Sequence, residues 1–364
     1  MPAILCLPDE ITDLFVNKLE LVEDFTRFSV ACKSWQSYVT RRATNRRFSP
    51  WLMLGPSHKD QQIEFSCLSA NRVFNLESFH TKEKKYWGSG FGWLVSFGLD
   101  LNILLVNPFS RLTLSLPPQS TFQHQRKLLT PPRLVKGFIQ KFILSAPPTP
   151  PHSCVVLAIT SELGRLSFAR PGDEAWISVE SPQTNYVDAI FYQGQFYAVD
   201  VEGPVSVIDI NCPQPSATVF AYPPQGIDEY TAAISKFYLV EISGYLCYVQ
   251  RFWFISPRGY TPRRTTRFKV SKLDFKTRRW IRVKDLGNHS VFLGDNTAFA
   301  ILASDFRGFS PNCVYFSDDH YFEYHERNCD MGVYDLGDKT VKPIYWGKNI
   351  GSEMSRPIFI MPSL

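Results

Sequence analysis

The sequence predicts a mainly β protein, a β-propeller of about six blades preceded by a small unit of three helices. The first observation is the content of 29 Phe, 16 Tyr and 8 Trp in 364 residues, because aromatic side chains pack well on pleated strands. The second is a series of short apolar runs from Trp51 onward, separated by Gly, Pro, Asn and Asp. The third is that residues 1–48 instead carry apolar residues at helical spacing.

The helical unit is expected to begin near Pro8, which suits the first turn of a helix and is followed by two acidic residues that favour its N-terminal end. An apolar stripe follows at helical spacing: Ile11, Leu14, Phe15 and Leu19. Two further short helices are expected, one from about residue 22 and one over residues 30–38. Three short helices cannot bury this much apolar surface alone, so we expect a partner or the next domain to cover one face.

The segments LPDEI (residues 7–11) and RFSVACKSW (residues 27–35) resemble an F-box, which binds the Skp-type adaptor of a cullin-RING ubiquitin ligase. The resemblance implies adaptor contacts by ten residues: Leu7, Pro8, Ile11, Leu14, Phe15, Leu19, Phe28, Val30, Cys32 and Trp35. Two departures from the pattern, Thr12 at a usually apolar position and Glu20 at a usual proline, are of a kind that weakens docking. The alternative is a helical cap that only packs on the β domain.

After residue 50, paired apolar runs recur, such as 194–200 with 205–209 and 312–316 with 332–336. A four-stranded antiparallel sheet repeated about every fifty residues is typical of a propeller blade. Six such units over residues 50–364 would average about 52 residues each, and five or seven blades remain possible. The apolar run at 358–360 is expected to supply a strand that closes the ring.

Several motifs of this region occur in a fixed order: GWL at 92–94, NPFS at 107–110, RPGDEAW at 170–176, GQFYAVD at 194–200 and PNCVYFSDD at 311–319. In this order they resemble the plant F-box proteins whose C-terminal region is called domain of unknown function 295 and is regarded as a β-propeller. The resemblance implies a plant protein with an F-box at residues 1–48 and this propeller at residues 50–364.

No catalytic site, metal site or cofactor is expected. The Asp and His residues at 318–325 lie between two cysteines, as metal ligands can, but Cys313 falls in an apolar strand and Asp318-Asp319 follows it as a turn would. The glycine-rich segment 88–92 precedes a strand rather than the helix that would hold a phosphate. The sequence has none of the common hydrolase, metalloprotease or kinase motifs.

The net charge of +5 is unevenly distributed, because residues 258–284 carry eleven basic residues against Asp274 alone. The first part of this segment is expected to be a long loop within a blade, and the second part a strand with Lys269 and Lys272 on a solvated face. The loop residues that would bind an acidic partner are Arg258, Arg263, Arg264 and Arg267. Nucleic acid is the less favoured partner, and a purely solvated basic face is the alternative.

The eight cysteines include no C-x-x-C pair, and several lie in apolar runs, so we expect buried reduced thiols. The N-terminus lacks a secretory pattern, and no apolar stretch approaches the ~20 residues of a membrane span. These observations predict a protein of the nucleus and/or cytoplasm that does not contact membranes.

Together the observations predict a non-enzymatic substrate-recognition subunit of an SCF-type (Skp-cullin-F-box) E3 ubiquitin ligase. The F-box would bind the Skp-type adaptor, and through it cullin, while the propeller would bind an unknown target protein. The alternative is a propeller interaction scaffold that is not engaged in ubiquitination. A propeller hydrolase or sugar-binding propeller is a third class, but the sequence lacks a catalytic constellation for it.

Overall fold

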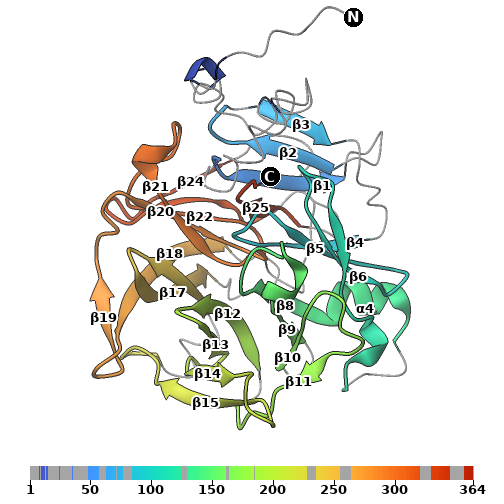
Figure 1. Cartoon of the computed structure of the whole chain (residues 1–364). Coiled ribbons are helices and arrows are strands. Elements are labelled where there is room, and N and C mark those ends of the chain that lie inside the picture. The colour runs from blue at the N-terminus through green and yellow to red at the C-terminus, as the bar shows by residue number, and fades with distance from the viewer. Residues whose placement is uncertain are drawn as a thin grey trace, which may run out of the picture.

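The structure is a computed structural model. It describes residues 8, 10–12, 14, 24 and 35 and most of residues 48–363. The ranges left out between 48 and 363 are 57–62, 71, 77–83, 124–128, 161–163, 184, 228–234, 255–263, 320–328 and 345–355. Within the described residues, six β-sheets follow one another around a ring in chain order (Figure 1). The prediction of a mainly β propeller of six blades is therefore confirmed, and we number the blades 1 to 6 from the N-terminal side. The seven-residue α-helix α4 (Pro131–Gly137) precedes blade 3.

The first three blades are four-stranded and antiparallel. The strands of blade 1 are β1 (Trp51–Pro56), β2 (Ile63–Cys67), β3 (Arg72–Leu76) and β25 (Ile358–Ile360). Those of blade 2 are β4 (Lys84–Gly88), β5 (Leu94–Gly98), β6 (Ile103–Val106) and β7 (Thr113–Ser115). Those of blade 3 are β8 (Ile139–Leu144), β9 (Val156–Thr160), β10 (Arg165–Ala169) and β11 (Ile177–Ser178).

Blades 4 and 5 repeat this design with longer strands. Blade 4 consists of β12 (Tyr186–Tyr192), β13 (Gln195–Asp200), β14 (Val205–Asp209) and β15 (Ser216–Ala221). Blade 5 consists of β16 (Ser235–Ile242), β17 (Tyr245–Phe254), β18 (Arg264–Asp274) and β19 (Arg279–Val283). Short 3-10 turns lie at Gln119–Thr121, Pro151–Ser153 and Ala303–Asp305.

Blade 6 differs from the expected antiparallel repeat. Its five strands lie in the order β21-β20-β22-β23-β24, and β20 pairs with β22 in parallel. Their bounds are β20 (His289–Leu293), β21 (Phe299–Leu302), β22 (Cys313–Phe316), β23 (Gly332–Asp335) and β24 (Val341–Lys342). The chain folds back as β21 beside β20 before it reaches β22, which explains why a regular strand-to-strand order fails here.

The ring is closed by strands from the two ends of the propeller sequence. The C-terminal strand β25 pairs antiparallel with β1, with Leu52 opposite Phe359. Blade 1 is thus built from both ends of this region, and opening the ring requires the loss of a sheet pairing rather than of a surface contact. The prediction that residues 358–360 close the ring is confirmed.

Each of the six junctions between neighbouring blades is filled by its own buried apolar cluster. Aromatic rings meet across five of them: Trp51–Phe109 at 5.3 Å, Trp87–Phe142 at 5.0 Å, Tyr192–Phe275 at 5.8 Å, Phe268–Phe316 at 5.3 Å and Phe292–Phe359 at 5.2 Å between centroids. Rings bury large areas and prefer such offset or edge contacts. The high aromatic content of the sequence is therefore concentrated where blades pack face to face.

The centre of the ring is occupied by the turn after β20, residues 294–297. The carbonyl of Gly294 accepts a hydrogen bond from Lys141 Nζ of blade 3 at 3.3 Å. Thr297 donates its backbone N–H to the Gly88 carbonyl of blade 2 at 2.8 Å. Gly88 in turn lies so close to β25 that a Cβ atom there would come within 2.4 Å of the Phe359 carbonyl oxygen. This turn, the central plug, thus ties blade 6 to blades 2 and 3.

Gly88→Ala is expected to lower the free energy of unfolding by about 2–3 kcal/mol, because the new Cβ must push the backbone of the closing strand away. Gly90→Ala is the matched control, since its Cβ would meet only Phe299 Cβ at 4.0 Å. Urea unfolding of both variants followed by Trp fluorescence measures the difference. Equal stability of the two variants would contradict the close approach of Gly88 to β25.

Candidate interaction surfaces

The described part of the F-box segment is a helical turn that begins at Pro8. Residues 10–12 and 14 are helical, and the Thr12 N–H donates to the Pro8 carbonyl at 3.0 Å. Ile11 and Leu14, three positions apart, are 40% and 62% exposed. Residues at this spacing share one helix face, so this turn presents an uncovered apolar stripe in the isolated chain.

Thr12, one of the two departures from the F-box pattern, lies on the other side of this turn. It is buried, and its hydroxyl donates to the Pro8 carbonyl at 3.1 Å. A hydroxyl satisfied within its own helix leaves the exposed Ile11–Leu14 face apolar. Trp35 is helical and half-buried, and the remaining predicted adaptor contacts lie outside the described residues: Leu7, Phe15, Leu19, Phe28, Val30 and Cys32.

The expected basic loop is only partly a loop. Arg258 and Arg263 lie outside the described residues, whereas Arg264 begins β18 and Arg267 lies within it, so their assignment to a loop was wrong. The cause is the length of β17, which extends to Phe254 and pairs with Arg264 beyond a register shift at 252–253. Both Arg264 and Arg267 are exposed.

The second part of the basic segment is a strand, as predicted, but its lysines point to opposite faces of the sheet. Side chains alternate along a strand, and Lys269 lies opposite Gln250 whereas Lys272 lies opposite Cys247. A blade is covered by a neighbour on each side, so neither face of β18 is simply a solvated face. Lys269 faces blade 4 and is half-buried.

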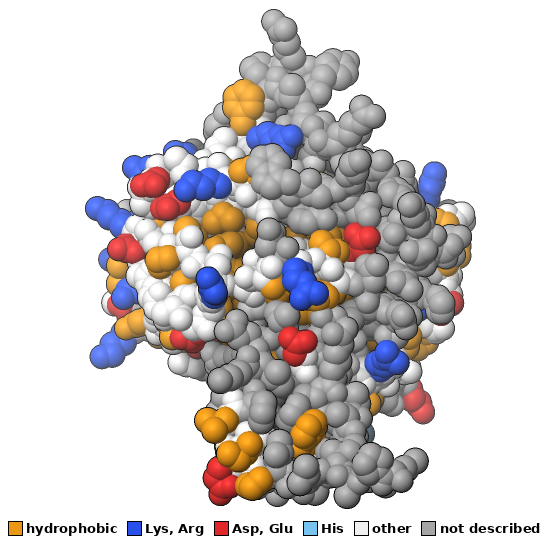
Figure 2. Space-filling view, turned by 90° about the horizontal axis from the view of Figure 1, so that it is seen from above, with side chains coloured by type: hydrophobic (Ala, Val, Ile, Leu, Met, Phe, Trp, Pro, Cys, Tyr) orange, Lys and Arg blue, Asp and Glu red, His pale blue; other side chains and the backbone are white. Residues whose placement is uncertain are grey.

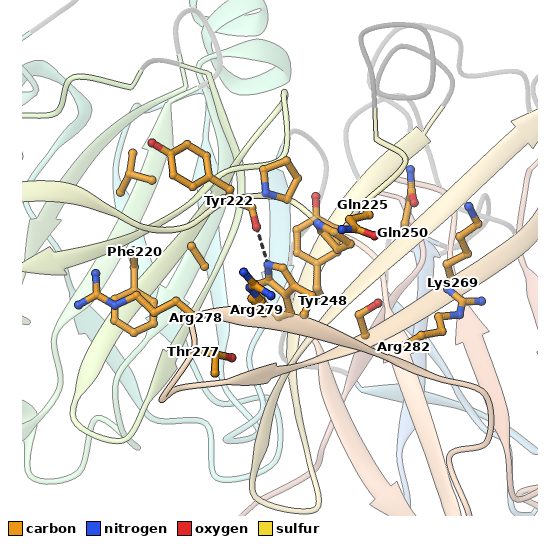
Figure 3. Close-up of a pocket in the computed structure, with 16 residues that line it drawn as sticks. Phe220, Tyr222, Gln225, Tyr248, Gln250, Lys269, Thr277, Arg278, Arg279 and Arg282 are labelled. Atoms are coloured by element: carbon orange, nitrogen blue, oxygen red, sulfur yellow. Dashed lines mark hydrogen bonds between the residues drawn. The ribbon is translucent and has the colours of Figure 1, made fainter.

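An open groove lies between blades 4 and 5, on the face of blade 5 that carries Lys269 (Figure 3). Its volume is about 1000 Å³. Blade 4 supplies residues 219–225, which are the end of β15 and the loop after it, and blade 5 supplies residues of β17, β18, β19 and the turn at 277–278. Trp280 Nε1 donates to the Tyr222 carbonyl at 2.8 Å and joins the two walls.

Beneath the groove, the blade interface contains a buried carboxylate and a buried phenol. The Tyr248 ring packs on Trp280 with centroids 5.1 Å apart, and its hydroxyl has no hydrogen-bond partner among the described residues. Asp200 accepts the Glu202 N–H with Oδ1 at 2.8 Å, while its Oδ2 has no described partner. Burial raises the pKa of Asp200 to about 6, and burial followed by the Asp200 charge raises the pKa of Tyr248.

A buried ionic network joins blades 5 and 6 on the opposite face of β17. Arg251 is fully buried and its guanidinium donates to Asp319 Oδ1 at 3.1 Å, Asp330 Oδ2 at 3.1 Å and the Ser317 carbonyl at 2.9 Å. Lys236 Nζ donates to the other Asp319 oxygen at 2.7 Å. Burial alone would raise the pKa of Asp319, but Lys236 and Arg251 outweigh it and hold this pKa below its usual range.

Sequence reasoning missed Arg251, although a single arginine within the apolar run 246–254 was a signal that could have revealed it. The same network accounts for the acidic pair that was weighed as a metal site. Asp319 binds Lys236 and Arg251, and Asp318 pairs with Arg356 at 3.2 Å. Cys313 is buried in the cluster between blades 6 and 1. Residues 320–328 are outside the description, and the described residues contain no group of side chains suited to a metal ion.

The fold defines a class, a six-bladed β-propeller, and a helical turn with an exposed apolar pair precedes it in the sequence. The KIB1-4 beta-propeller family model matches residues 65–335. This chain therefore belongs to the KIB1-4 β-propeller family.

Its relatives support the plant F-box assignment. The F-box protein At2g26160 of Arabidopsis thaliana is 25% identical over 342 residues, which cover 86% of this chain and 95% of that protein. The F-box protein SKIP23 of the same plant is 24% identical over 372 residues, covering 91% and 88% of the two chains. Among solved structures, TolB from Acinetobacter baumannii matches 86% of this chain and 66% of its own with a TM-score of 0.43 and 8% identity, a likeness too weak to bear on function.

Of the helices in the described ranges, none has the length and apolar character needed to cross a bilayer. The described cysteines are all free thiols, and Cys67, Cys154, Cys247 and Cys313 are buried.

Arg251→Met is expected to destabilise the protein by about 3–5 kcal/mol, because it leaves the buried Asp319 and the half-buried Asp330 without their shared cation. The matched control is Arg307→Ala, which removes an exposed arginine of blade 6 and should change the free energy of unfolding by less than about 0.5 kcal/mol. Thermal and urea unfolding of both variants measure the effect. A tolerated Arg251→Met variant would show that the network does not hold blades 5 and 6 together.

Asp200→Asn is expected to stabilise the protein by about 1–3 kcal/mol at pH 7.5, because a pKa raised on folding means that the charged form costs free energy in the native state. That cost is fully present above the folded pKa of about 6, shrinks as the pH falls toward the ordinary pKa of 3.8, and is lost below it, where the carboxyl is protonated in both states. The gain should therefore be less than half as large at pH 4.5. Urea unfolding at the two pH values, with exposed Asp305→Asn as control, tests this; a pH-independent gain contradicts it.

Proposed function

We propose that this protein is the substrate-recognition subunit of an SCF-type E3 ubiquitin ligase that works in the nucleus or the cytoplasm. Its F-box binds a Skp-type adaptor, and through it cullin, while the propeller binds a target protein that is not yet identified. The observation that carries the proposal is the exposed apolar pair Ile11 and Leu14 on a helical turn, in a chain whose relatives are named F-box proteins.

The proposed role needs no catalytic residue in this chain. Holding a target near a ubiquitin-loaded enzyme raises the effective concentration of its lysines, which accelerates transfer by proximity alone. The propeller suits this task, because its blades are fixed by ring closure and its loops and side walls are free to differ. We therefore propose a receptor subunit rather than an enzyme.

The alternative is an interaction scaffold that no longer binds the adaptor. Its support comes from Thr12 and Glu20, the two departures from the F-box pattern. Thr12 faces away from the exposed apolar pair, which removes one of these reasons. Glu20 lies outside the described residues. The adaptor-binding role is thus the better supported of the two.

Ile11→Asp with Leu14→Asp is expected to reduce adaptor co-purification at least tenfold, because charged side chains cannot be buried in an apolar interface without a partner. Leu7 and Pro8 belong to the same set of expected adaptor contacts, so the same loss is expected for Leu7→Ala with Pro8→Ala. Leu112→Asp is the control, since Leu112 is 51% exposed on blade 2, far from the F-box in sequence.

The measurement is co-expression with the Skp-type adaptor, pull-down and thermal unfolding of each variant. The propeller should unfold at the same temperature in all of them. Adaptor binding by the Ile11→Asp, Leu14→Asp variant at the wild-type level would exclude the F-box role and favour the scaffold.

A further inference from the structure

The groove between blades 4 and 5 has a one-sided charge. Its lining includes Lys269, Arg278, Arg279 and Arg282 and no Asp or Glu. Lys269 and Arg282 lie at one end of the groove, and Arg278 lies at the other, over the Phe220 ring at 4.9 Å (Figure 3). By contrast, basic and acidic side chains are interspersed over the described part of the face shown in Figure 2.

The groove cations differ in their ion pairing from the cations that lie between blades. Across the described residues, no carboxylate forms an ion pair with any of the four. The cations that hold blades together behave differently: Lys141 pairs with Asp188, and Lys236 and Arg251 pair with Asp319. Cations that serve the fold thus have acidic partners, whereas the groove cations leave their charge available to a ligand.

Lys269 and Arg282 belong to a local cluster of three cations with Arg267. Side chains of Arg267 and Lys269 share one face of β18, and Arg282 lies opposite Ser271, one pair further along that face. Both Arg267 and Lys269 lie over the Phe252 ring, at 4.3 and 5.0 Å from its centroid. Burial lowers the pKa of Lys269, and the neighbouring charges of Arg267 and Arg282 lower this pKa further.

The rest of the groove can hold an extended chain. Gln225, Gln250, Ser271 and Thr277 offer hydrogen-bonding groups along its walls, and the Tyr222 side chain at its edge is 76% exposed. The hydrogen bond from Trp280 to the Tyr222 carbonyl fixes one wall to the other. A preformed groove of this kind reduces the entropy cost of binding a flexible segment.

We propose that the groove between blades 4 and 5 binds a phosphorylated peptide segment of the target protein, with the phosphate at Lys269 and Arg282 and the segment running toward Arg278. The inference rests on the proposed role of the propeller as the target-binding part. A phosphate carries nearly two charges and three acceptor oxygens, so it matches adjacent cations better than a single carboxylate does. Arginine also binds phosphate oxygens in a bidentate manner.

Single-stranded RNA is the less favoured ligand for this groove. Such ligands are held by several aromatic rings on which successive bases stack. Here the Trp280 ring packs on Tyr248 and the Phe220 ring is covered by Arg278, which leaves Tyr222 as the exposed ring among the described lining residues. The groove therefore fits a charged peptide better than a run of bases.

The test uses the immobilised full-length chain and degenerate libraries of ten-residue peptides with a fixed central phosphoserine, phosphothreonine or phosphotyrosine. The same libraries without phosphate and a ten-nucleotide degenerate RNA are the comparison probes. We expect at least tenfold greater retention of a phosphorylated library than of its unphosphorylated counterpart or the RNA. Equal retention with and without phosphate, or preferential retention of the RNA, would overturn the proposal.

Charge reversal locates the binding site. Lys269→Glu with Arg282→Glu is expected to reduce phosphopeptide retention at least tenfold. Lys272→Glu is the matched control, because it makes the same change on the same strand but on the opposite face of the sheet, and it should stay within twofold of wild type. Thermal unfolding verifies that the variants are folded. Retention by the folded double variant at the wild-type level would exclude this groove as the site.

The proposal for the groove and the proposal for the F-box can be refuted separately. The Ile11→Asp, Leu14→Asp variant should retain phosphopeptides normally, and the Lys269→Glu, Arg282→Glu variant should still co-purify with the adaptor. Loss of adaptor binding without loss of peptide binding therefore concerns the F-box alone, and the reverse result concerns the groove alone.

Discussion

The pairing of β25 with β1 is the constraint on which the rest of this propeller depends. Every blade is covered on both faces by its neighbours, and the two apolar junctions that flank blade 1 contain side chains of both paired strands. The central plug adds a second tie, because one turn of blade 6 is hydrogen-bonded to blades 2 and 3. Closure therefore fixes the relative positions of blades 4 and 5, and with them the two walls of the groove.

Charge has two separate uses in this molecule. Between blades, the buried Lys141 and Arg251 and the half-buried Lys236 pair with aspartates, and the pairs specify which faces meet. On the outer part of blade 5, cations of the same chemical type are partly exposed and have no acidic partner among the described residues. The net charge of +5 hides this division, since paired and unpaired cations contribute equally to the sum.

The repeating apolar runs predicted the six blades and the closing strand, because strand patterns depend on local alternation. The order of strands in blade 6 could not be predicted, since the return of β21 beside β20 depends on the contacts of residues 294–297 with distant blades. The groove was missed for a similar reason. Alternation in β18 and β19 shows which sheet face carries Lys269 and Arg282, but only the packing of blade 4 against blade 5 shows that these two side chains line a groove.

The central plug also affects how relatives of this protein can diverge. Residues 294–297 touch several blades at once, so a change there must be accommodated by all of them. New binding surfaces are therefore harder to form at the centre of the ring than at its periphery. Variation is tolerated more easily in blade loops and at the outer ends of the junctions, where a substitution meets one or two blades. Proteins encoded by duplicated genes can therefore bind different partners at these sites while they keep the same ring.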